Sequence, residues 1–193
     1  MKSKKLIYNR IAPLFFAAAF LFFGTVALKA AFQDEQKEEL DPLRYYQAKY
    51  EAEYNEPIQL VVDAVNKAID DIDCVVTKNV MKTARNGRMK AIIRSDYCVF
   101  AEGDSTFDLI KKYSYKTPHI RGGSWLNGRM QYKFMLKEKN DSTVYLLLKG
   151  NLSGFEDTMT NRVHFWKSNG IFEHRMLESI KENIETLKEE NEY

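Results

Sequence analysis

The chain of 193 residues is poor in cysteine, proline and glycine, with two, four and nine of each. So few prolines and glycines exclude a collagen-like chain and argue against low-complexity or disordered composition. Two cysteines, and three histidines without ligand spacing, give no zinc site, and we expect no metal and no other cofactor. The sequence also lacks the Walker loop, the dinucleotide fingerprint and the nucleophile elbow of α/β-hydrolases.

The first 31 residues contain no acidic residue at all. They hold five cations, and because the whole chain has a formal net charge of +2, the remaining residues carry −3. Nucleic-acid binding requires concentrated lysine and arginine, so this mildly acidic remainder argues against a nucleic-acid partner. The five cations are Lys2, Lys4, Lys5, Arg10 and Lys29.

A continuous apolar segment, residues 11–32, follows the basic leader 1–10. Roughly 18 to 21 helical residues span the hydrocarbon of a membrane, whereas the apolar region of a signal peptide is usually about 7 to 15 residues long. We therefore expect one transmembrane signal anchor, and because Leu28-Lys29-Ala30 is a poor cleavage site, a cleaved signal with secretion is the alternative. The positive leader predicts a cytoplasmic N-terminus and an extracytoplasmic domain, periplasmic in a bacterium.

Cys74 and Cys98 lie on either side of a predicted β-hairpin. Asn86-Gly87 is typical of a hairpin turn, and a hairpin folded about Asn86 places residue 74 opposite residue 98. In the oxidising compartment beyond a membrane the two cysteines would then form a disulfide. The alternative is two buried free thiols, because a register change of one residue would put them on opposite faces of the sheet.

The periodicity of the remaining sequence predicts one α+β domain, residues 45–193, after a charged spacer at 33–44. Tyrosine and alanine alternate with charged residues around Tyr50, which predicts a strand with one buried face. Pro57 then opens a helix with a single apolar stripe, because a proline in the first turn sacrifices no hydrogen bond.

Two strand pairs and two more helices follow in the predicted order. The hairpin about Asn86 is the first pair, and the alternating segments 130–136 and 144–148 are the second. A short helix separates the pairs, and a long amphipathic helix closes the chain. Because hairpins join most strands, we expect an antiparallel sheet of about five strands in the order β-α-β-β-(α)-β-β-α, with the two amphipathic helices packed on one face.

Three local features mark this order: Pro57-Ile58-x-x-Val61-Val62-x-Ala64-Val65 after the first strand, the turn Asn86-Gly87-Arg88, and the last helix, Phe172 to Leu187. With them the layout resembles the helix-grip domains of envelope lipoproteins such as BamC, in which a curved antiparallel sheet wraps a long C-terminal helix. Those lipoproteins carry a lipidated cysteine where this chain has a bare apolar segment. The resemblance implies an accessory or binding role in the cell envelope, with an envelope protein or a lipid as partner.

Two polar stretches are candidates for a ligand site. In the first, arginines and glycines suit an anion or a sugar; the alternative is a loop whose arginines pair with acids. In the second, two carboxylates and a histidine are candidate acid–base groups; the alternative is a polar connector, with Phe165 and Trp166 as plugs of the core. The candidates are Arg121, Gly122, Gly123, Trp125, Arg129, Glu156, Asp157, His164 and Trp166.

From the sequence we expect a membrane-anchored, non-catalytic binding or accessory module, which requires an exposed apolar or aromatic patch. A lipid or small-ligand carrier of the helix-grip type is the first alternative, and it requires an apolar cavity of several hundred Å³ between the sheet and the last helix. An enzyme is the second alternative. It requires one cleft that holds Arg121, Arg129, Glu156, Asp157 and His164.

Overall fold

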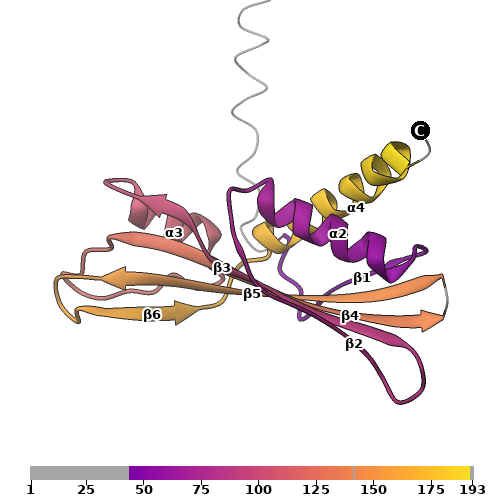
Figure 1. Cartoon of the computed structure of the whole chain (residues 1–193). Coiled ribbons are helices and arrows are strands. Elements are labelled where there is room, and N and C mark those ends of the chain that lie inside the picture. Colours follow the sequence, from indigo (N-terminus) through magenta and orange to yellow (C-terminus); the bar gives the residue numbers. More distant parts are fainter. Residues whose placement is uncertain (1–43, 141, 192–193) are drawn as a thin grey trace, which may run out of the picture. The chain divides into compact units, whose positions relative to one another are not determined.

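The structure, a computed structural model, describes residues 44–140 and 142–191. The expected leader 1–10, membrane span 11–32 and spacer up to residue 43 lie outside the described residues. Among those that the structure does describe, no helix is long and apolar enough to cross a membrane. The described part is an α+β domain with a six-stranded antiparallel sheet and three helices (Figure 1), so the predicted fold class is confirmed.

The strand order is β1-β5-β4-β3-β2, and β6 pairs with the edge of β5 that β1 also uses. The prediction of about five strands is wrong by one, because β6 lies in the second candidate stretch, which was interpreted as a ligand site or a polar connector and not as a strand. The elements are β1 (Tyr50–Tyr54), α2 (Ile58–Asp70), β2 (Val76–Thr83), β3 (Met89–Glu102), α3 (Thr106–Tyr113), β4 (Asn127–Asn140), β5 (Thr143–Glu156), β6 (Arg162–Trp166) and α4 (Ile171–Asn191).

Rows of apolar side chains on one face of the sheet form the core. Phe134 of β4 stands between Ile93 of β3 and Leu148 of β5, and none of the three is more than 1% exposed. The apolar stripes of α2 and α4 pack over these rows on the same side of the sheet (Figure 1), as the sequence predicts. Helical spacing puts one stripe of each helix on the sheet and leaves its charged positions in water.

Cys74 and Cys98 form a disulfide, with their Cα atoms 5.4 Å apart. The hairpin has the expected register about Asn86, since Lys78 pairs with Arg94, and a bulge next to Val76 adjusts the register near the bond. Gly87 has a φ of 79°, which the turn requires and which glycine adopts without strain. Of the two alternatives for the cysteines, the structure therefore has the disulfide, which hints at an oxidising, extracytoplasmic environment.

The disulfide should contribute substantially to stability, because it closes a loop with a sequence separation of 24. Loop closure of this length removes roughly 3 kcal/mol of chain entropy from the unfolded state. We expect reduction of the bond, or replacement of both cysteines by alanine, to lower the urea midpoint accordingly. The reductant should leave the double alanine variant unchanged, and equal midpoints for the oxidised and reduced wild type would contradict the prediction.

Candidate functional site

The structure brings four of the nine predicted site residues together, namely Trp125, Glu156, His164 and Trp166. The indole of Trp125 meets the His164 and Trp166 rings edge-on, with ring centroids 5.6 and 5.5 Å apart. Gly154 makes room for this cluster, because a Cβ there would lie 3.0 Å from the Trp166 ring and 3.1 Å from the Trp125 ring. Trp125 is buried, so the rings fill space under the end of the sheet more than they present a platform to a ligand.

The carboxylate of Glu156 holds the loop between β5 and β6. The side chain is fully buried, and it accepts hydrogen bonds from the backbone N–H groups of Ser124, Thr158, Met159 and Thr160 and from the Thr160 hydroxyl. Burial disfavours the charge, but these hydrogen bonds, the Thr160 hydroxyl first, outweigh it and lower the pKa of Glu156 to about 2. A carboxylate so fully occupied by protein donors orders a loop and is not free to transfer protons.

His164 joins the same network at its outer end. Its Nε2 lies 2.7 Å from the Oγ1 of Thr160, which donates to Glu156. The histidine is half-buried on β6, and the residue beside it, Phe165, points to the other side of the sheet. Phe165 is 64% exposed, so its predicted place as a core plug is wrong, whereas Trp166 does pack against the core.

The remaining candidates do not join this cluster. Arg121 and Asp157 are exposed on loops, and Gly122 and Gly123 form a turn against Met159 and Ile120. Arg129 lies on β4 and points away from the helices, into a groove that Arg121 does not line. The arginines of the predicted anion or sugar loop therefore do not line one site together. The cleft that the enzyme alternative requires is not formed by these residues.

A cleft of about 450 Å³ opens where the edge of β5 pairs with none of the strands that the structure describes. Pairing with β1 ends at Leu148, and pairing with β6 begins at Leu152. In an antiparallel ladder every second residue directs its N–H and C=O to the same side. Phe155 bonds on the β4 side: its N–H donates to the side-chain oxygen of Asn127, and its C=O accepts from the N–H of Leu126. Gly150 is an odd number of positions away, so it directs its backbone groups to the opposite edge, into the gap, where none of the described strands lies opposite.

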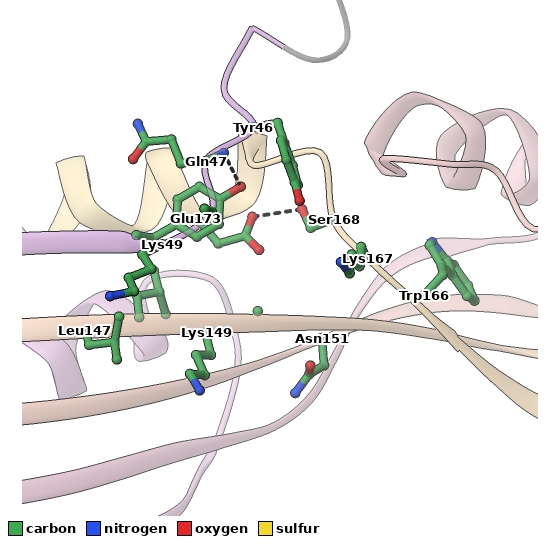
Figure 2. A pocket seen from close by; sticks show the side chains of 14 residues that line it. Tyr46, Gln47, Lys49, Leu147, Lys149, Asn151, Trp166, Lys167, Ser168 and Glu173 are labelled. Atoms are coloured by element: carbon green, nitrogen blue, oxygen red, sulfur yellow. Dashed lines mark hydrogen bonds between the residues drawn. The ribbon is translucent and has the colours of Figure 1, made fainter.

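The inner wall of this cleft carries the carboxylate of Glu173, from the first turn of α4 (Figure 2). Glu173 is only 1% exposed, and its Oε2 accepts a hydrogen bond of 2.8 Å from the Ser168 hydroxyl. A Cβ at Gly150 would collide with its Oε1, so glycine is required there for the carboxylate to fit. Burial raises the pKa of Glu173, and the hydrogen bond from Ser168 opposes that shift only in part.

The sequence analysis missed Glu173, although the sequence carries a signal for it. The residue lies three and seven positions before Met176 and Ile180, so it falls on the apolar stripe of the last helix. A glutamate on a buried stripe is unusual and needs a polar partner. The partner is Ser168, three residues before the helix begins.

The sheet face turned away from α2 and α4, called here the open face, carries a second hollow of about 440 Å³. In register, Val99 of β3, Arg129 of β4, Ser153 of β5 and Phe165 of β6 stand side by side. Apolar side chains surround this row, and several of them are largely exposed. We give the name apolar end to the apolar side chains in and around this row, namely Tyr97, Val99, Leu126, Phe155, Val163 and Phe165.

A third hollow lies between the sheet and α4, beside the disulfide. It measures about 290 Å³ and is lined mainly by apolar side chains, among them Phe100, Met130, Phe172 and Met176. Elsewhere under the helices the core is filled, with Phe134, Leu148 and Ile180 almost completely buried. The apolar space that a carrier requires between the sheet and the last helix is therefore limited to this groove.

Comparison of the chain with protein-family models, with curated proteins and with solved structures finds no match. The likeness to the BamC helix-grip domains therefore stays a prediction.

The raised pKa of Glu173 predicts a pH-dependent stability. A carboxyl whose pKa is higher in the folded state stabilises the fold fully at pH values below its unfolded pKa, and that contribution is lost as the pH rises through the folded pKa. Glutamine has no charge to bury, so Glu173→Gln should melt at a higher temperature than wild type at pH 7.5, and the difference should vanish near pH 4.

The matched control is Glu185→Gln, at an exposed position of the same helix, which should show no such pH-dependent difference. Thermal melts followed by circular dichroism at the two pH values measure the effect. A Glu173→Gln variant that melts below wild type at pH 7.5 would show instead that the charge is needed for the fold.

Proposed function

We propose that this chain is a membrane-anchored, extracytoplasmic module that binds a component of the cell envelope through the open face and catalyses no reaction. The observation that carries the proposal is the apolar end. Phe165, Leu126 and Val163 are 64%, 52% and 50% exposed, and they lie around one groove. Scattered exposed apolar side chains are ordinary, but a contiguous group around a hollow is typical of an interaction site.

The N-terminal sequence and the cysteines support the membrane-anchored, extracytoplasmic location in this proposal. The basic leader 1–10 and the apolar segment 11–32 favour a signal anchor with the domain on the far side of the membrane. A disulfide between Cys74 and Cys98 suits an oxidising compartment and is rare in the cytosol. Secretion after signal cleavage is the alternative for the location of the domain, and the binding surface would be the same.

The helix-grip resemblance supports the same role. A sheet with the long helix α4 on one side leaves the opposite face of the sheet free for a partner (Figure 1). In the described part of the chain no helix covers that face. An accessory role of the kind that the BamC resemblance implies would use such a free face.

A photo-crosslinking experiment tests the proposal. We expect benzoylphenylalanine in place of Phe165 to give adducts with envelope components when membranes of the native host are irradiated. The matched control is the same substitution at Phe107, an aromatic residue of α3 that is 43% exposed but lies on the helix side of the sheet. Adducts at Phe165 should exceed those at Phe107 several-fold.

Both possible failures of this experiment are informative. Equal adducts at the two positions would mean that exposure alone decides the yield, and the open face would lose its special role. Adducts only at Phe107 would move the binding surface to the helix side. Either result contradicts the proposal.

The groove between the sheet and α4 favours one second candidate, the lipid or small-ligand carrier. Its volume of about 290 Å³ and its mainly apolar lining would suit part of one acyl chain. Phe172 and Met176 of α4 form one wall, and Phe100 and Met130 of β3 and β4 form the other.

Native mass spectrometry of the full chain after gentle detergent extraction tests the carrier. A carrier should retain one lipid per chain, and Met176→Trp, which fills the groove, should abolish that adduct. Leu126→Trp, which adds the same bulk on the open face, is the matched control and should keep the lipid. Loss of the lipid in the Leu126 variant alone would exclude the groove as the binding site.

A further inference from the structure

The open face carries a row of four cations on four neighbouring strands. Lys78 of β2 pairs with Arg94 of β3, Arg94 pairs with Lys133 of β4, and Lys133 pairs with Lys149 of β5. Residues paired in this way point to the same side of a sheet, and neighbouring strands are about 4.8 Å apart. We call Lys78, Arg94, Lys133 and Lys149 the cation row.

The cation row itself contains no carboxylate, and the acids of the open face at the β1 edge, Glu51 and Glu53, stand opposite Leu147 and Tyr145. The next row along the strands is aliphatic, formed by Val80, Ile92, Met135 and Leu147, and the row after it adds Lys82, Lys90 and Lys137. Between β2 and β5 these three rows contain seven cations and no carboxylate. None of the ion pairs among the described residues involves the cation row. Like charges placed directly opposite each other destabilise a sheet, so the row carries an energetic cost.

The helices α2 and α4, on the other side of the sheet, carry an excess of the opposite charge. On α2 and α4 seven carboxylates are exposed, against three exposed lysines and arginines. The seven are Asp63, Asp70, Glu178, Glu182, Glu185, Glu189 and Glu190. A domain with one basic and one acidic side is turned by an anionic surface so that the basic side faces it. The charge distribution therefore favours an extended anionic partner for the open face.

The apolar side chains of the open face favour a lipid surface over a nucleic acid. The row next to the cation row is aliphatic, whereas single-stranded nucleic acids are bound mainly by stacking on aromatic rings. Beyond the cation row lies the apolar end, with Val163 and Phe165 exposed at the edge strand β6. Cations for headgroup phosphates beside apolar side chains for the interface are the combination that interfacial membrane binding uses.

The length of the spacer allows this contact if residues 11–32 are anchored. Twelve residues, 33–44, extend to at most about 40 Å, which is comparable to the diameter of a domain of about 150 residues. Any face of the domain can therefore reach the bilayer that holds the anchor. The anchor also keeps the domain at a high effective concentration near lipid, so weak contacts suffice.

We propose that the open face docks on an anionic phospholipid surface, with the cation row on the headgroup phosphates and the apolar end at the membrane interface. This inference rests on the proposed function and names its envelope component as the lipid surface. Of the side chains that line the Glu173 cleft, it uses only Lys149. It also gives Arg129, which stands in the same row as Val99 and Phe165 of the apolar end, a headgroup contact in place of the predicted role in a loop site.

Lysine acetylation of the full chain in nanodiscs tests the inference. One set of discs contains phosphatidylcholine alone, and the other a two-to-one mixture of phosphatidylcholine and phosphatidylglycerol. Acetylation of Lys78, Lys133 and Lys149, measured by mass spectrometry, should fall several-fold in the anionic discs. Salt at about 1 M shortens the Debye length to about 3 Å and should restore it. Lys111 of α3 and Lys181 of α4 are exposed controls on the helix side and should not change.

A charge reversal gives the second measurement. Lys133→Glu combined with Lys149→Glu should abolish the protection of Lys78, whereas Lys111→Glu combined with Lys181→Glu should leave it intact. Equal acetylation in both kinds of disc would overturn the inference, as would protection that appears only when an oligonucleotide or an acidic protein is added. If Phe165 gives protein adducts while the discs show no difference, the proposed function stands and the lipid surface is wrong. If both experiments fail, the proposed function fails with it.

Discussion

The pairing of β5 with β4 is the constraint on which the rest of the domain depends. It runs from Arg129 opposite Ser153 to Asn140 opposite Thr143, and it fixes which residues of both strands face the helices. Leu146 and Leu148 enter the core, while Leu147 and Lys149 face outward. A slip of one residue would exchange the two sets, so a single register creates both the core and the charged face. The edge of β5 that β4 does not use pairs with β1 and with β6, and the gap between these two strands is the cleft that Glu173 lines.

Local signals made much of this fold predictable. Asn86-Gly87 fixes a turn through its φ, so the sequence alone predicts the register of β2 and β3. Pro57 and the apolar stripe after it are also local patterns, and they predict α2. The pairing of Tyr50 with Leu148 joins segments far apart in the chain, and no local pattern encodes it. Phe165 and Trp166 show the same limit, because only the pairing with β5 decides which of the two adjacent rings faces the core.

The candidate sites were less predictable than the fold, because they depend on where side chains from distant segments meet. Glycine and arginine in one loop suggested a ligand site, but the strand that follows takes Arg129 onto the open face, into a groove that Arg121 does not line. The cation row is assembled from four strands, and no window of the sequence shows it as a basic cluster. A net charge of −3 outside the first 31 residues conceals it entirely, since all 27 acidic residues of the chain lie in that part. Net charge describes the amount of charge and not its distribution.

The pairing of β1 with the distant strand β5 also decides when the domain can fold. A chain is synthesised, and exported, with its N-terminus first, so β1 emerges long before β5, its only strand partner in the described part. The apolar stripe of α2 must likewise wait for α4, the last element, to cover it. The hairpin of β2 and β3 can form early, because its contacts are local. The core therefore closes only after the whole chain has emerged, and until then the apolar face of α2 is exposed to any chaperone that meets the growing chain.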